Sequence, residues 1–114
     1  LNSDAMVHTG VIDMDLVPAL RDIRSQRKNK NTIRREALYL HKRISAMAAK
    51  SGLCCLAEVS GGKGYHFWFP VAEPVPAAAM RQVLQTMTRE IERDVTAYSL
   101  EVFPKQDRVT GKGY

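Results

Sequence analysis

The sequence predicts an α+β domain, and two patterns carry this prediction. Four stretches have the apolar, β-branched and aromatic composition of strands, at residues 7–16, 53–59, 65–71 and 97–103. Two longer stretches repeat apolar residues every three or four positions, which is the period of an amphipathic helix. The chain has 114 residues, 45% of them hydrophobic, which is enough to bury one core. We assign residues 7–114 to this domain, complete or in part, and residues 1–6 to a leader or a cloning remnant.

The first strand, Val7–Leu16, contains two acids in an unusual arrangement. Asp13 and Asp15 are two residues apart, so both side chains point to the same face of the strand. Aspartate is depleted in strands, and two carboxylates on one face repel each other. A divalent cation such as Mg²⁺ or Mn²⁺, which prefers oxygen ligands, explains this pair. A solvent-facing strand with incidental acids is the alternative.

The segment after this strand is basic. Residues 17–30 are expected to include a short helix and contain a series of Arg and Lys side chains, which form either a solvated surface or a phosphate-binding patch. The next helix is expected to be capped by Asn31 or Thr32 and to end at Gly52. His41 lies off the apolar face of this helix and is expected at the surface. The residues of that apolar face are Ile33, Ala37, Leu40, Ile44 and Met47.

A glycine-rich turn, Ser60–Gly64, joins the second and third strands. Glycines let a backbone approach a ligand and expose its N–H groups to anions, and Lys63 adds a point charge suited to phosphate. The third strand is expected to stop at Glu73–Pro76, with Pro76 in the first turn of the second helix. The apolar face of this helix contains Ala79, Val83, Met87, Ile91 and Val95, and Met80 and Leu84 widen it.

The order of these elements is strand, helix, strand, strand, helix, strand, the βαββαβ order of ferredoxin-like and RRM-like folds. In that topology both helices cover one face of a four-stranded antiparallel sheet, the first and third strands are central, and the fourth flanks the first. If the aromatic and aliphatic sets face the helices, the acids and the histidine project together from the open face. The predicted open-face set is Asp13, Asp15, His66 and Glu101. Such a set suits a divalent-metal site for phosphoryl or nucleotidyl transfer.

The composition narrows the classes of partner. The formal net charge of +5 fits a polyanion such as nucleic acid or nucleotide phosphate. No apolar run reaches the roughly 18–20 residues of a membrane span, so no membrane partner is expected. Cys54 and Cys55 are adjacent and point to opposite faces of a strand, which disfavours a disulfide. We expect buried thiols in a cytoplasmic protein.

Three short motifs together resemble those of archaeo-eukaryotic primases. Val11–Asp15 resembles their first motif, hydrophobic residues followed by Asp-x-Asp. Ser60–His66 resembles the second, a small residue, any residue and then His after a glycine-rich turn, although Gly64 stands where serine is common. Leu100–Glu101 resembles the third, a hydrophobic residue and then an acid. The run from Glu101 onwards is similar to the primase–polymerases of mobile-element and CRISPR-associated settings.

The resemblance implies an RRM-like catalytic core that synthesises or extends primers from nucleoside triphosphates. It implies that Asp13, Asp15 and Glu101 hold Mg²⁺ or Mn²⁺, with Asp107 as the other candidate for the third acid. DNA would be the template and primer, with RNA as a further partner. The nucleotide-binding residues that it implies are Ser60, Gly62, Lys63, Gly64, His66 and Lys105.

Other functions remain open at this point. An RRM-like RNA-binding module without catalysis fits Lys63–Phe69, which partly matches the third-strand signature of that module. A nucleotide cyclase or nuclease with the same metal chemistry, or a catalytically inactive structural domain, also fits the predicted fold. Metal dependence separates these classes, because a binding module should be indifferent to a chelator and to loss of Asp13.

Overall fold

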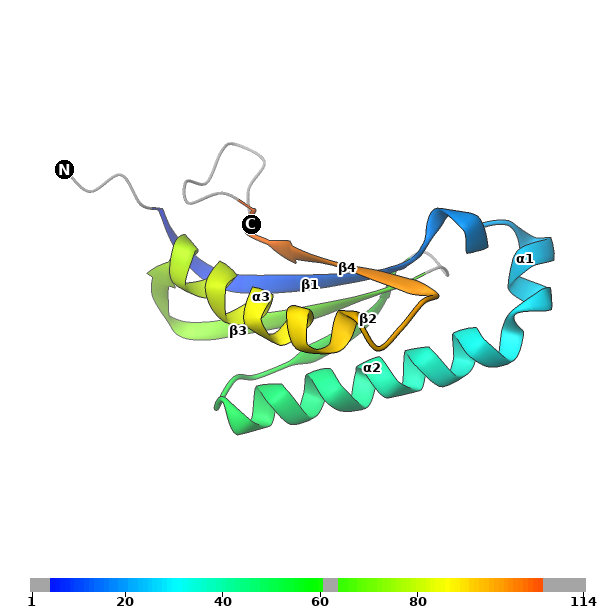
Figure 1. The fold of residues 1–114 in the computed structure, drawn as a ribbon. Coiled ribbons are helices and arrows are strands. Elements are labelled where there is room, and N and C mark those ends of the chain that lie inside the picture. The colour runs from blue at the N-terminus through cyan, green and yellow to red at the C-terminus, as the bar shows by residue number, and fades with distance from the viewer. Residues whose placement is uncertain (1–4, 61–63, 106–114) are drawn as a thin grey trace.

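The structure is a computed structural model that describes residues 5–60 and 64–105 (Figure 1). Its helices and strands are β1 (Met6–Leu16), the 3₁₀ turn η1 (Pro18–Leu20), α1 (Ile23–Lys28), α2 (Lys30–Lys50), β2 (Leu56–Ser60), β3 (Gly64–Pro76), α3 (Ala77–Glu92) and β4 (Tyr98–Phe103). The α+β class that the sequence predicts is confirmed. No helix in the described part of the chain has the length and apolarity needed to cross a membrane.

The four strands form one antiparallel sheet in the order β2-β3-β1-β4. β1 and β3 are therefore central, and β4 flanks β1, as the sequence predicts. α2 and α3 lie on the same side of the sheet (Figure 1). In the described part of the chain, no helix covers the opposite face of the sheet, and Asp13 and Asp15 of β1 project from that face.

The core lies between the sheet and the two long helices, and the predicted alternation along the strands is confirmed. Ile12 and Met14 of β1 and Phe67 and Phe69 of β3 are fully buried on the helix side. They pack with Leu40, Ile44, Leu84 and Ile91 of the helices. Val11 is an exception, because it belongs to the open face and is only 2% exposed. In the register of the sheet it lies between Trp68 and Phe103.

The third strand was predicted to cover residues 65–71 and to be broken by Glu73–Pro76. This was wrong, because β3 continues through that segment to Pro76. Val7 and Met6 of β1 pair with Val75 and Pro76, beyond an irregularity between Val7 and Thr9. β2 pairs only with residues 64–68, so this part of β3 is an edge on its other side. Proline lacks an N–H donor and is tolerated on such an edge.

The starts of α2 and β2 also differ from the predicted positions, and hydrogen bonds accompany both differences. The helix cap predicted at Asn31 or Thr32 was wrong, since α2 follows Asn29, whose side-chain amide donates back to the Ser25 carbonyl. β2 begins later than predicted. The N–H of Leu53 closes the end of α2 by donating to the Ala48 carbonyl over 2.8 Å.

His41 and the cysteines also differ from expectation. The His41 ring is half-buried and packs edge-on against Tyr65 at 4.5 Å and Phe67 at 5.0 Å between ring centroids, so the predicted surface position was wrong. Its Nδ1 bonds the Ala37 carbonyl. Both cysteines are free thiols, but Cys54 is exposed rather than buried.

A buried carboxylate joins α2 to the start of β4. Glu36 is 7% exposed, and its Oε1 accepts hydrogen bonds from the backbone N–H groups of Thr96 at 2.9 Å and Ala97 at 2.7 Å. Its Oε2 accepts from the Thr96 hydroxyl at 3.2 Å. The carboxylate thereby fixes where β4 begins, and hence the register that brings Glu101 opposite Asp13.

Candidate active site

Four ionisable residues form a single line across the open face of the sheet. Asp13 of β1 pairs directly with His66 of β3 on one side and with Glu101 of β4 on the other. Glu58 of β2 pairs with His66 and completes the line. Residues directly opposite on one sheet face have Cβ atoms about 4.5–5.5 Å apart, so the four side chains are neighbours. We call Glu58, His66, Asp13 and Glu101 the acid–histidine row.

Asp13 is the centre of this row and lies close to two other acids, Asp15 and Glu101. Its Oδ1 lies 3.4 Å from His66 Nε2, yet this buried atom accepts no hydrogen bond from the residues that the structure describes. Burial raises the pKa of the Asp13 carboxyl, and the nearby negative charges of Asp15 and Glu101 raise it further. His66 opposes this effect. A cation near Asp13 would relieve both the unsatisfied oxygen and the charge repulsion.

Asp15 occupies the next position of β1 on the same face, and glycine makes room for it. Asp15 pairs with Gly64 of β3 and with Ser99 of β4. A Cβ atom built on Gly64 would lie 2.5 Å from Asp15 Oδ1 and closer still to the Met14 carbonyl oxygen. The Asp15 carboxylate therefore lies over the backbone of Gly64. This contact accounts for glycine where the primase motif commonly has serine.

Replacing Gly64 with alanine is expected to displace Asp15 and to weaken Mn²⁺ binding by roughly tenfold. This is the lower end of the loss of metal affinity seen when a residue that positions a metal ligand is changed. Isothermal titration of Mn²⁺ measures this effect. Ser99→Ala, on the opposite side of Asp15, is the matched control and should bind Mn²⁺ as the parent protein does. Unchanged affinity in Gly64→Ala would show that the Asp15 position is unimportant for the metal.

Glu58 belongs to this site although the sequence analysis did not identify it. Its Oε1 accepts a hydrogen bond from the Trp68 indole N–H at 3.0 Å and lies 3.5 Å from His66 Nδ1. The imidazole thus has Glu58 on its Nδ1 side and Asp13 on its Nε2 side. The available signal was the alternation of β2, which places Glu58 on the same face as His66 once the Ser60–Gly64 turn sets the register.

Glu101 is in the row but has a different partner. Its carboxylate forms an ion pair with Lys105 at 3.0 Å, and Lys105 also lies over the Phe103 ring at 4.9 Å. Across residues 5–60 and 64–105, no three His, Cys, Asp or Glu side chains are already assembled as metal ligands. The structure therefore brings Asp13, Asp15 and His66 together, with Glu101 alongside and turned to Lys105.

The remaining candidate residues are only partly described. Ser60 ends β2 opposite Gly64, but its side chain lies outside the described part of the structure, as do Gly62, Lys63 and Asp107 entirely. The roles predicted for these residues, and the metal-binding role of the acids, remain predictions.

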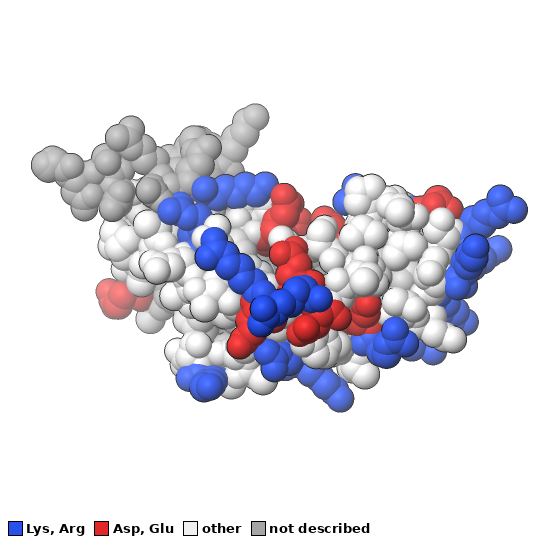
Figure 2. Space-filling model, in the orientation of Figure 1, with Lys and Arg blue, Asp and Glu red and all other residues white. Residues whose placement is uncertain are grey.

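Acidic and basic side chains are intermixed over much of the face that Figure 2 shows. Acidic side chains gather in the middle of this face with basic side chains among them, and further basic side chains lie at the right-hand end, where Figure 1 places α1.

Comparison with known proteins identifies the family. A family model described as "TOTE conflict system, Archaeo-Eukaryotic Primase domain" matches residues 1–114, the whole length of the sequence. A search of curated proteins found no match. The resemblance to primases that the three motifs indicate is thus confirmed over the full sequence. The chain belongs to the archaeo-eukaryotic primase domain family of TOTE conflict systems.

Proposed function

We propose that this domain is a metal-dependent nucleotidyltransferase that synthesises or extends primers from nucleoside triphosphates on a DNA template. Family membership supports a primase-like function. The observation that carries the finer proposal is the buried Oδ1 of Asp13, which lacks a hydrogen bond from the described residues and lies beside Asp15 in a line with His66. The strand order β2-β3-β1-β4 supports the ferredoxin-like, RRM-like form of the fold.

The residues present suit a hard divalent cation. Asp13 and Asp15 offer carboxylate oxygens on one face, and the raised pKa of Asp13 reflects its burial first and then the negative charge of the neighbouring acids. We assign the binding of Mg²⁺ or Mn²⁺ to Asp13, Asp15 and Glu101. When bound, the metal would activate the attacking hydroxyl and stabilise the leaving pyrophosphate.

The other residues of the site would bind and orient the triphosphate. His66 Nε2 faces the acids, where it can donate a hydrogen bond to a phosphate oxygen once a cation has engaged Asp13. Lys105 lies beside Glu101 and provides a second donor. The remaining phosphate contacts are assigned to the turn residues Ser60, Gly62, Lys63 and Gly64. The proposal places the protein in the cytoplasm.

Primer extension tests this function. The parent protein should incorporate labelled nucleotides on a primed DNA template with Mn²⁺, and a chelator should abolish the incorporation. The control is the double variant Asp13→Ala with Asp15→Ala, which should be inactive yet folded. Incorporation that is absent in the parent, or that survives in the double variant, would reject the proposal.

RNA binding without catalysis is the second candidate function. Trp68 and Phe103 flank Val11 on the open face, and Trp68 lies on the third strand, one of the two strands on which RRM-like modules place the aromatic rings that stack bases. If this function is correct, RNA binding should be unaffected by the chelator and by the double variant. The two candidates therefore give opposite results in the same pair of assays.

Glu58 is expected to affect nucleotide binding through His66. Glu58→Ala removes the partner of Nδ1, so the KM for the nucleotide should rise by roughly fivefold, the equivalent of the 1 kcal/mol at the upper end for an exposed ion pair. Glu58→Gln retains an oxygen acceptor for both Trp68 and His66 and should restore most of the affinity. Steady-state kinetics distinguish this from a general loss of structure, which would lower kcat in both variants.

A further inference from the structure

We propose that the basic end of the molecule and the cavity beside it bind single-stranded nucleic acid, with phosphates on the basic side chains and one base in the cavity. The inference deepens the proposed function, since it supplies a path for the template strand. It places that strand on the helix side of the sheet, whereas the acid–histidine row lies on the open side. Binding without catalysis tests it separately.

The charge of this end is the first observation. Between residues 21 and 35 there are seven Arg and Lys residues and one acid, Asp22, a formal charge of +6 against +5 for the whole chain. The Asp22 carboxylate is engaged by the Ser25 N–H at the start of α1. We define the basic end as the exposed residues Arg24, Arg27, Lys28, Lys30 and Arg34.

No ion pair joins one of these five cations to an acid within residues 5–60 and 64–105. Their charge can therefore meet an external anion. A closely spaced series of such cations at one end of a molecule matches the charge spacing of a nucleic-acid backbone better than that of an isolated anion.

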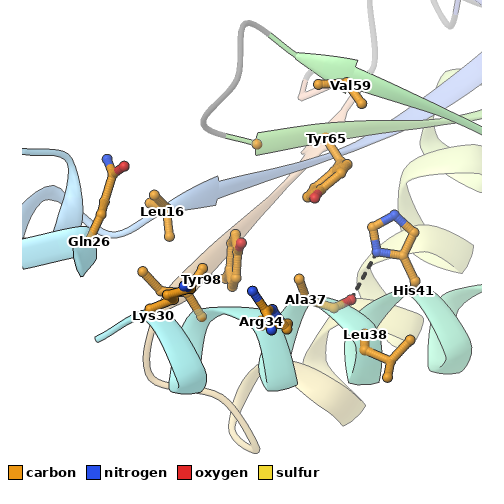
Figure 3. Close-up of a pocket in the computed structure, with 12 residues that line it drawn as sticks. Leu16, Gln26, Lys30, Arg34, Ala37, Leu38, His41, Val59, Tyr65 and Tyr98 are labelled. Atoms are coloured by element: carbon orange, nitrogen blue, oxygen red, sulfur yellow. Dashed lines mark hydrogen bonds between the residues drawn. The ribbon is translucent and has the colours of Figure 1, made fainter. Parts of the chain in front are cut away.

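The cavity is the second observation. It has a volume of about 530 Å³ and lies between α2 and the sheet, and Lys30 and Arg34 of the basic end belong to its wall. Figure 3 shows His41 of α2, Tyr65 of β3 and Tyr98 of β4 around the same space. This volume falls within the usual range of ligand pockets. Aromatic side chains are the groups on which proteins stack unpaired bases.

The cavity exists because β2 is not covered by a helix. Val59 faces the helix side of the sheet, opposite Tyr65 in the register, but is 67% exposed. Leu38 on the facing side of α2 is 56% exposed. An occupant must therefore be apolar where it meets Val59 and Leu38 and anionic where it meets Lys30 and Arg34. A nucleotide of a single strand has both parts.

The position of the cavity connects it to the candidate active site. Gly64 lines the cavity, and the Asp15 carboxylate lies over the same glycine on the opposite face of the sheet. A nucleic-acid strand held at the basic end is thus anchored near the end of the sheet where β1 carries Asp15 and β3 begins at Gly64. A duplex would not serve, because its bases are paired and unavailable to the aromatic rings.

Fluorescence anisotropy with a labelled oligothymidylate of about 20 nucleotides, in a chelator, tests the electrostatic part. The variant carries Arg24→Gln, Arg27→Gln and Lys28→Gln, and the control carries Lys42→Gln, Lys50→Gln and Arg93→Gln, which removes the same charge from exposed positions elsewhere. The variant should bind at least tenfold more weakly. The slope of log affinity against log salt should become shallower by about 2, because each of the three lost phosphate contacts contributes about 0.7 to it. Equal losses in variant and control would overturn the proposal.

A second pair of variants tests the cavity. Val59→Glu places a carboxylate at the cavity, whereas Leu56→Glu places one on the same strand but on the open face, and both positions are exposed. Val59→Glu should weaken binding of the oligothymidylate about fivefold or more and leave an abasic oligomer of equal length unaffected. Loss of binding in Leu56→Glu alone would place the strand on the open face and overturn the proposal. Oligouridylate in parallel distinguishes RNA from DNA.

These outcomes are separable from the test of catalysis. If oligonucleotide binding follows the pattern above but no nucleotide is incorporated, the proposed function fails and this binding surface stands. If incorporation occurs and the variants bind as the parent does, the proposed function stands and this inference fails.

Discussion

Replacement of Asp13 by asparagine is expected to reduce metal-dependent incorporation about 10³-fold and, at neutral pH, to raise the melting temperature. A bound metal contributes several kcal/mol of transition-state stabilisation, and each 1.36 kcal/mol is a factor of ten in rate. Both effects come from the charge of the Asp13 carboxylate, which a metal needs and which the folded protein alone disfavours. The native structure places a carboxylate where burial and the charge of Asp15 oppose its ionised form.

The pH dependence has a definite sign. Because the pKa of Asp13 is raised in the folded protein, the folded state binds the proton more tightly than the unfolded state does. The free energy of unfolding therefore falls as the pH rises through the window above the ordinary carboxyl pKa of 3.8. The advantage of Asp13→Asn should be full at pH 7 and vanish below that window. Urea titrations across this pH range measure it.

Asp22 provides a control, because its pKa is shifted in the opposite direction to that of Asp13. Hydrogen bonds from the Ser25 N–H hold the pKa of Asp22 below its ordinary value, so Asp22→Asn should destabilise the protein at pH 7. If Asp13→Asn is instead less stable than the parent at neutral pH, the ion pair with His66 outweighs the burial of Asp13.

Replacement of Glu36 by alanine is expected to cause the largest loss of stability, about 3 kcal/mol or more. Two backbone N–H groups and one hydroxyl would lose their shared acceptor, and each buried unsatisfied group costs about 1–3 kcal/mol. Equilibrium unfolding in urea measures this change. The loss should be accompanied by weaker Mn²⁺ binding, since Glu36 sets the start of the strand that carries Glu101.

Glu90→Ala is the matched control for this prediction. Glu90 is exposed, and its interaction is an ion pair with Arg43 at 3.5 Å, which should contribute less than about 1 kcal/mol. If both variants lose the same small amount, the Glu36 carboxylate is not the connection between α2 and β4 that the hydrogen bonds indicate.

The faces of the strands could be predicted because the side-chain period of a strand is two. That rule alone assigns Asp13, His66 and Glu101 to one face and Phe67 to the other, and the register confirms the assignment. The neighbours of each strand were predicted separately, from the βαββαβ order of the elements, and the strand order confirms them.

Contacts that depend on packing between distant segments could not be predicted in this way. Glu36 reads as a polar position of an amphipathic helix, and its partners lie 60 and 61 residues away. His41 is followed by basic residues in the sequence, yet in the fold its ring packs edge-on against Tyr65 of β3. The continuation of β3 through its prolines depends on β2 being short, which is a property of another strand.

The contact between Gly64 and Asp15 couples two positions that lie far apart in the sequence. In a relative with a side chain at position 64, the second acid and the facing backbone must shift, because a Cβ atom there would overlap Asp15 Oδ1 and the Met14 carbonyl oxygen. Within the family, the placement of the second acid should therefore depend on which residue precedes the aromatic strand. The pair is a marker by which sequences could be sorted into two forms of the candidate site, and a design that grafts one motif should transfer the other with it.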